Sequence, residues 1–177
     1  MKTIIALGGS SSKSSINKAF ASHAAQQVSD VQVNVLDLND YELPLYSVDV
    51  EEASGIPENA TKLSAAIEAA DGIVLSLAEH NGSYAAAFKN ALDWISRIDT
   101  KLWKDKPMLL LATSPGARGG ANVLALAKSV YPHLGGNIIA DFSLPSYYEN
   151  FSEAGIKDET LSEELKQKIN LFQNSLV

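Results

Sequence analysis

Short apolar runs alternate with amphipathic runs along the whole chain, and this alternation limits the folds that the sequence can adopt. One run, Gly72–Leu77, is almost continuously apolar, which is typical of a parallel strand buried on both faces. The amphipathic runs carry apolar side chains at helical spacing. The predicted strands are Thr3–Leu7, Val31–Leu36, Gly72–Leu77, Pro107–Thr113 and Asn137–Phe142, and the predicted helices are Ile16–Val28, one that begins at Pro57, Phe88–Ile98, Ala121–Tyr131 and Thr160–Leu176. The pattern predicts an α/β sandwich around a parallel sheet.

Right-handed crossovers leave few topologies for such a sheet. We expect the flavodoxin-like strand order 2-1-3-4-5, which places the first strand centrally and predicts a ligand at the carboxyl ends of strands one, three and four. The irregular stretch Asp37–Pro57 follows the second strand and could overhang that ligand. Because no repeat, linker or composition break interrupts the chain, we expect one domain over residues 1–177.

Composition excludes several classes of function. The net charge of −7 argues against broad nucleic-acid binding. The absence of cysteine excludes disulfides, thiolate metal sites and a cysteine nucleophile. The chain shows no signal-peptide pattern and no apolar run long enough to cross a bilayer, so we expect a cytoplasmic protein without a membrane partner.

The first predicted strand is followed by a loop rich in serine, Gly8–Asn17, which leads into the first helix. Serine hydroxyls donate hydrogen bonds to oxygens, and a helix start presents unpaired N–H groups and the positive end of its dipole. The loop therefore predicts a phosphate site. Serine and glycine are also ordinary turn residues, and Ser15 could simply be a helix N-cap.

Two further unusual loops follow the third and fourth strands, Ala78–Tyr84 and Thr113–Gly120. His80 and Tyr84 in the first of them can meet a flat ring, and the glycines of the second let backbone N–H groups approach a ring edge. A flat heteroaromatic ring attached to one phosphate would use all three loops. Flavin mononucleotide (FMN) has that shape.

The segment Glu79-His80-Asn81-Gly82-Ser83, with Lys89-Asn90-Ala91-Leu92-Asp93-Trp94 after it, strongly resembles the NADPH-dependent FMN reductase family, which includes quinone, azo-dye and chromate reductases. The usual family forms are Pro-Glu-Tyr-Asn-Gly-Ser and Lys-Asn-Ala-Leu-Asp-Trp. The opening loop Gly9–Asn17 looks like the family's Gly-Ser-x-Arg-x-x-Ser-x-Asn, and Ser114-Pro115-Gly116 with Gly119-Gly120 looks like its third flavin loop.

The resemblance implies an FMN cofactor, with NADPH or NADH as co-substrate. A hydride would pass through flavin N5 to a quinone, azo compound, free flavin or similar small acceptor. It also implies a homodimer or homotetramer. No side chain is implied as a catalytic nucleophile. The implied phosphate-binding residues are Ser10, Ser12, Ser15, Ile16 and Asn17; Glu79, His80, Asn81 and Gly82 would lie along the ring, and Ser114, Gly116 and Gly119 near the ring or ribityl chain.

The chain departs from the family pattern at the site. Ser12 stands where the family commonly has arginine, and Lys13 is one position away from compensating for that charge. His80 replaces a tyrosine beside the ring, and Ala78 replaces a proline. We therefore expect weaker FMN binding than in relatives that carry the arginine.

Several side chains have alternative interpretations. Glu79 is expected to accept backbone hydrogen bonds that shape its turn rather than to act as an acid or base. His80 could be a turn residue or contact the ring, and Arg118 could meet an NADPH phosphate or face solvent. Asp93 and Trp94 could serve packing or a subunit interface. Tyr41, Tyr46, Tyr147 and Tyr148 could cover the cleft or pack at an interface.

Two other classes of function stay open. One is a flavodoxin-like electron carrier that holds FMN without oxidising NAD(P)H itself. The other is a phosphate binder that holds no flavin. A phospho-accepting regulator would be one example of the second class. Such a protein needs acidic residues after the first strand, and this chain has Gly8-Gly9-Ser10 there, which argues against that example.

Overall fold

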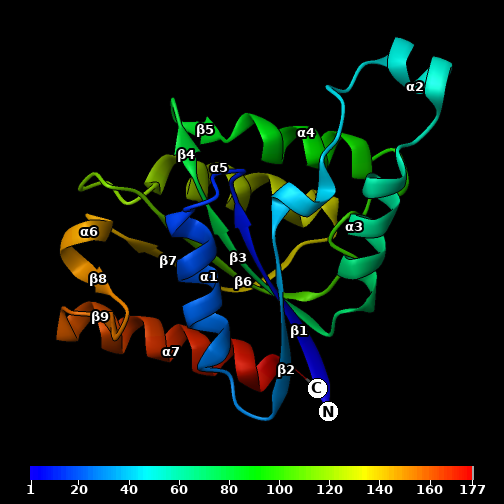
Figure 1. Cartoon of the computed structure of the whole chain (residues 1–177). Coiled ribbons are helices and arrows are strands. Elements are labelled where there is room, and N and C mark those ends of the chain that lie inside the picture. Colours follow the sequence, from blue (N-terminus) through cyan, green and yellow to red (C-terminus); the bar gives the residue numbers. More distant parts are fainter. Residues whose placement is uncertain (177) are drawn as a thin grey trace.

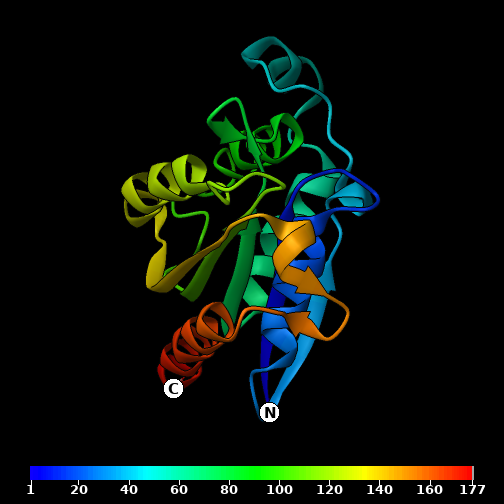
Figure 2. The same ribbon diagram turned by 90° about the vertical axis from the view of Figure 1, so that its left-hand side faces the viewer.

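A computed structural model describes residues 1–176 and shows a five-stranded sheet with helices on both sides (Figures 1 and 2). The strands are β2 (Val31–Leu36), β1 (Lys2–Gly9), β3 (Gly72–Leu77), β6 (Pro107–Thr113) and β7 (Asn137–Leu144), in this spatial order. All four pairings are parallel. The predicted fold class and strand order are therefore confirmed.

Two hydrophobic cores lie on opposite faces of the sheet. On β1, Ile5 and Leu7 belong to one core while Ile4 and Ala6 belong to the other, as the period of two along a strand requires. The first core is covered by α3 (Glu58–Ala69), α4 (Ala86–Ile95) and α5 (Ala121–Val130), and the second by α1 (Ile16–Gln26) and α7 (Glu159–Ser175). The five predicted helices are confirmed, with ends displaced by up to three residues.

Short elements occur where the sequence predicted only loops. The stretch predicted to be irregular contains a 3₁₀ turn, η1 (Leu38–Tyr41), and the helix α2 (Val48–Ser54). A second turn, η2 (Tyr131–Leu134), follows α5, and a short helix, α6 (Tyr147–Asn150), follows β7. Two small hairpins complete the fold: β4 (Glu79–His80) with β5 (Ser83–Tyr84), and β8 (Phe151–Ser152) with β9 (Gly155–Ile156). These elements are too short to produce a period in the sequence.

Helix α2 buries none of its residues and projects away from the sheet, as both ribbon views show (Figures 1 and 2). Side chains of α4 fix the segment that leads to it. Trp94 Nε1 donates to the Pro44 carbonyl over 2.7 Å, and Asn90 accepts from the Tyr46 N–H over 2.8 Å. The motif residue Trp94 is fully buried and therefore serves packing, one of its two predicted roles.

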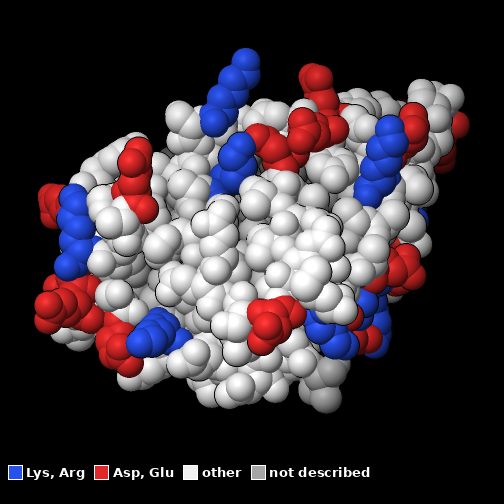
Figure 3. Space-filling view, turned by 60° about the horizontal axis from the view of Figure 1, so that its bottom comes forward, with Lys and Arg blue, Asp and Glu red and all other residues white. Residues whose placement is uncertain are grey.

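The face turned forward in Figure 3 carries basic and acidic side chains interspersed around a largely uncharged centre. This face has no continuous basic patch of the kind that binds nucleic-acid backbones. Within residues 1–176, no helix is long and apolar enough to cross a membrane.

Candidate functional site

The three loops predicted to converge line one cavity of about 290 Å³ at the carboxyl ends of β1, β3 and β6. Its lining residues are Ser10, Ser12, Ser14, Ser15, Ile16, Asn17, Ala78, Glu79, His80, Thr113, Ser114, Pro115 and Tyr148. Eight of the twelve predicted site residues therefore line the same cavity, while Asn81, Gly82, Gly116 and Gly119 are not part of the lining. The predicted position of the cleft, beside the central strand, agrees with this arrangement.

The serine loop folds tightly onto the start of α1. Ser15 is the N-cap, and its Oγ accepts from the Lys18 N–H over 3.1 Å. A Cβ on Gly8 would lie 2.4 Å from the backbone nitrogen of Lys18, so this glycine is required by the packing of α1 on β1 rather than by a ligand. The Ser12 N–H donates to Ser10 Oγ over 3.1 Å and holds the loop against the cavity. The loop thus has both a structural cap and hydroxyl groups facing the cavity.

No lysine or arginine of residues 1–176 lines this cavity. Lys13 borders a neighbouring hollow that shares Ser14, Ser15 and Ile16 with this cavity. Lys18 forms an ion pair with Asp37 at the end of β2, and its hydrogen bond lowers the pKa of that carboxyl group. The N-terminus of α1 therefore adds positive potential to a cavity whose described lining holds no lysine or arginine.

Asn17 is 2% exposed and joins α1 to two strands of the sheet. Its Oδ1 accepts from Ser76 Oγ over 2.7 Å and from the Thr113 N–H over 3.2 Å, and its Nδ2 donates to the Thr113 carbonyl over 3.1 Å. Asn17, which was predicted to bind the phosphate, thus links α1 to β3 and β6. One N–H of its amide stays available to the cavity, which Asn17 also lines.

The second loop is the hairpin β4–β5. Asn81 and Gly82, both with positive φ, form its two-residue turn, which matches the Asn-Gly preference of type I′ turns. Glu79 accepts from the Val123 N–H over 2.9 Å and from Asn122 Nδ2 over 3.1 Å, at the start of α5. Glu79 accepts a backbone hydrogen bond, as expected, but the donor belongs to α5 and not to its own turn, and His80 lies at the cavity wall.

The third loop is held in shape by hydrogen bonds to one of its carbonyl groups as well as by its glycines. The Gly116 carbonyl accepts from the Gly119 N–H over 3.1 Å and from the Ser146 N–H over 2.9 Å. Gly119 has φ +57°, and a Cβ there would lie 2.6 Å from Ser143 Oγ, so this position packs against β7. Arg118 donates to Asn122 over 2.8 Å and is exposed. Only Ser114 of the three predicted residues of this loop reaches the cavity wall.

Five lining residues were not among the predicted binding residues: Ser14, Ala78, Thr113, Pro115 and Tyr148, of which Tyr148 was expected either to cover the cleft or to pack at an interface. Four of them belong to the predicted loops, and the alternation of serines along the first loop is the signal that could have identified Ser14. Tyr148 belongs to α6, outside the three loops. Its position depends on tertiary contacts that the sequence does not indicate.

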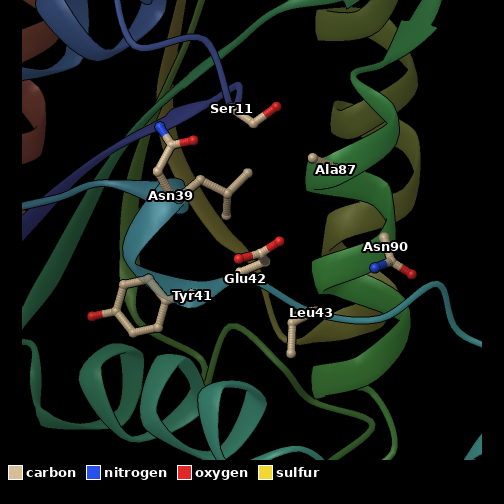
Figure 4. Close-up of a pocket in the computed structure, with 8 residues that line it drawn as sticks. Ser11, Asn39, Tyr41, Glu42, Leu43, Ala87 and Asn90 are labelled. Atoms are coloured by element: carbon tan, nitrogen blue, oxygen red, sulfur yellow. The ribbon is translucent and has the colours of Figure 1, made fainter.

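A second hollow of about 310 Å³ lies on the opposite side of the serine loop (Figure 4). Ser11 faces it, whereas Ser10 and Ser12 face the first cavity. Its other walls come from η1 and the residues after it, including Glu42, and from Ala87 and Asn90 of α4. The serine loop therefore separates two hollows, and Ser11 provides a natural comparison for Ser12.

A flavodoxin-like sheet with a cavity walled by hydroxyl groups and a helix N-terminus at the ends of its central strands defines a domain suited to a phosphate-bearing ligand. Residues 2–149 match the family described as NADPH-dependent FMN reductase, and the chain belongs to that family.

The chain is 34% identical over 119 residues to the quinone reductase of Escherichia coli strain K12; the match covers 67% of this chain and 63% of the relative, just under two thirds of its length. It is 31% identical over 178 residues to the NADPH:quinone oxidoreductase of Arabidopsis thaliana, with 96% of this chain and 89% of the relative covered. The solved structure of FerB, a flavoenzyme NAD(P)H:(acceptor) oxidoreductase from Paracoccus denitrificans, superposes with a TM-score of 0.77 at 27% identity, covering 99% of this chain and 97% of that one.

Proposed function

We propose that this protein is an NAD(P)H-dependent FMN oxidoreductase that reduces a quinone, azo compound, free flavin or similar small acceptor. The observation that carries the proposal is the single cavity formed by the serine loop, the β4–β5 hairpin and the third loop. Family membership and the names of the quinone reductase relatives support the same activity. They favour a reductase over a carrier that only holds FMN.

The residues present fit FMN with one departure from the family pattern. The phosphate would be held by the backbone N–H groups at the start of α1, together with the hydroxyls of Ser10, Ser12 and Ser14. Because no cationic side chain among the described residues lines the cavity, hydrogen bonds and the helix dipole supply the attraction. We therefore expect weaker binding than in a relative with arginine at the position of Ser12.

The hairpin would hold the ring on one side through Glu79 and His80, and the third loop on the other through Ser114, because these three residues line the cavity. The other predicted ring residues, Asn81, Gly82, Gly116 and Gly119, belong to the same two loops but do not line it. When bound, FMN supplies the hydride chemistry of the family. The chain's residues orient it. Glu79 keeps the hairpin on α5, because its carboxylate accepts from the Val123 N–H. His80 is exposed and lines the cavity, so its ring is available to an entering acceptor.

A homodimer or homotetramer is part of the proposal, and α2 supports it. Leu45 is 82% exposed beside this helix, Val48 is 58% exposed on it, and Ile56 is exposed just after it. Exposed apolar side chains on a projecting segment are typical of an interaction surface. Sedimentation analysis tests the assembly. A single domain over residues 1–177 and a cytoplasmic location stay predictions, which limited proteolysis and cell fractionation would check.

The proposal is tested by titrating the purified protein with FMN and following the visible spectrum, then adding NADPH or NADH without oxygen. Flavin bands that shift on binding and then bleach establish the reductase. Bands that neither nucleotide bleaches favour the electron carrier, and failure of FMN to bind refutes both.

The serine loop supplies a matched pair of variants for this titration. We expect Ser12→Ala to raise the dissociation constant for FMN about 5-fold, the equivalent of one hydrogen bond of about 1 kcal/mol. Ser11→Ala, on the same loop but facing the second hollow, is expected to change it less than about 2-fold. Equal effects of the two substitutions would contradict the assignment of the phosphate to the first cavity.

A further inference from the structure

Tyr148 is unusual among the six tyrosines of this chain. It is 67% exposed, whereas the other five are buried or half-buried. It is also the one lining residue of the first cavity that comes from outside the three loops. Its ring is therefore outside the hydrophobic cores and available to a ligand in the cavity.

The backbone around Tyr148 is fixed to the third loop. The Ser146 N–H donates to the Gly116 carbonyl over 2.9 Å, and the Tyr147 N–H donates to the Ser114 carbonyl over 3.0 Å. Ser146 has φ +46°, a left-handed conformation that a non-glycine residue adopts only when its surroundings impose it. These contacts set the direction in which α6 leaves β7. The position of Tyr148 is thus coupled to the loop that is expected to hold the flavin.

The other side of the same segment is fixed to α1. The ring of Tyr147 is buried and stacks on Phe151 with centroids 4.9 Å apart, and Phe151 packs edge-on against Phe20 of α1 at 5.8 Å. Tyr148 stands nearly perpendicular to Tyr147, with centroids 5.4 Å apart. Tyr147 therefore acts as an anchor, and Tyr148 is held between α1 and the third loop.

We propose that Tyr148 is a fourth cofactor-binding element, which closes the cavity between the start of α1 and Ser114 by placing its ring against bound FMN. This inference rests on the proposed function, because it takes FMN as the ligand. The ring would contact the part of the molecule between the phosphate and the flavin, since the residues on either side of it are assigned to those two ends. Its hydroxyl adds a hydrogen-bond donor to a wall that has no cation.

The exposure of Tyr148 provides a direct chemical test. Tetranitromethane nitrates accessible tyrosines, and peptide mass spectrometry identifies the residue. Without FMN, we expect Tyr148 to react first among the six tyrosines, and saturating FMN to slow its nitration at least about 5-fold. Half-buried Tyr41, which lines the second hollow, serves as the internal comparison whose rate FMN leaves unchanged. Equal nitration of Tyr148 with and without FMN would overturn the inference.

Binding measurements provide a second readout. We expect Tyr148→Ala to raise the FMN dissociation constant about 10-fold and Tyr148→Phe to raise it less than about 3-fold, because the ring carries most of the contact. Leu171→Ala, at an exposed apolar residue of α7, is the control and should leave binding unchanged. The melting temperature without FMN should move by less than about 2 °C in all three variants.

The outcomes separate this inference from the proposed function. If the wild-type protein binds no FMN, the proposed function fails, and the role of Tyr148 fails with it. If FMN binds and is reduced by NAD(P)H, but Tyr148→Ala binds as tightly as the wild type, the function stands and the inference is refuted.

Discussion

Replacing Asn17 with alanine tests how the candidate site is built. Asn17 lies at the start of α1, and its side chain reaches Thr113, 96 residues further along the chain. Two donors, the Ser76 hydroxyl and the Thr113 N–H, and one acceptor, the Thr113 carbonyl, lose their partner in this variant. All three residues are at least 98% buried, so water does not readily replace the lost amide.

The expected destabilisation follows from these three hydrogen bonds. Each contributes about 1 kcal/mol net, and a buried group left without a partner costs about 1–3 kcal/mol. Asn17→Ala should therefore lower the free energy of unfolding by about 3 kcal/mol. With a slope near 2 kcal/mol per molar urea, the midpoint of unfolding should fall by about 1.5 M.

Urea titration followed by tryptophan fluorescence measures this change, since Trp94 and Trp103 are both fully buried. The matched control is Asn34→Ala, which removes an exposed asparagine from the edge strand β2 and should shift stability by less than about 0.5 kcal/mol. A loss below about 1 kcal/mol in Asn17→Ala would refute the argument, because it would mean that the amide does not link α1 to β6.

Three further substitutions test single contacts. Asp37→Asn removes the charge paired with Lys18 and should cost about 1 kcal/mol of folding free energy at pH 7. Because folding lowers the pKa of Asp37, this contribution is lost as the pH falls through the folded pKa. The urea midpoints of variant and wild type should therefore converge in acid, and a constant gap would contradict the ion pair. Trp94→Phe removes the donor to the Pro44 carbonyl and should cost about 1 kcal/mol of folding free energy. It should also speed cleavage near α2 by added protease, and unchanged cleavage would show that this hydrogen bond does not hold the segment that leads to α2. Glu79→Gln should lower the melting temperature by about 2–4 °C, since a carboxylate at the start of α5 is replaced by a neutral amide; a higher temperature would contradict that role.

The strands could be predicted because each carries its own signal, and their order could be predicted because right-handed crossovers leave few topologies. The period of two on β1 divides its side chains between two cores, and an almost continuous apolar run such as β3 fits only a strand covered on both faces. The position of the cavity followed from this order, since the carboxyl ends of β1, β3 and β6 meet at one edge.

The roles of individual polar residues could not be predicted in the same way, because they depend on partners distant in sequence. Asn17 fits a phosphate-binding motif equally well whether or not its amide is engaged by Thr113. Ser11 and Ser12 are neighbours of identical chemistry, and only the path of the loop assigns them to different hollows. Tyr148 lies on a helix of four residues, which is too short to show a period.

Several polar groups at this site, from both side chains and backbone, hold the loops in place. Asn17 links the serine loop to β6, Glu79 links the hairpin to α5, and the Gly116 carbonyl links the third loop to Ser146. What is left facing the cavity is mainly hydroxyl groups and the start of α1. Such a lining favours a ligand with an anionic group that accepts hydrogen bonds. The redox chemistry would then belong to the ligand, and the protein residues would orient it. Ser12, in place of the arginine that is usual in the family pattern, is therefore expected to lower the affinity for FMN rather than to change its position.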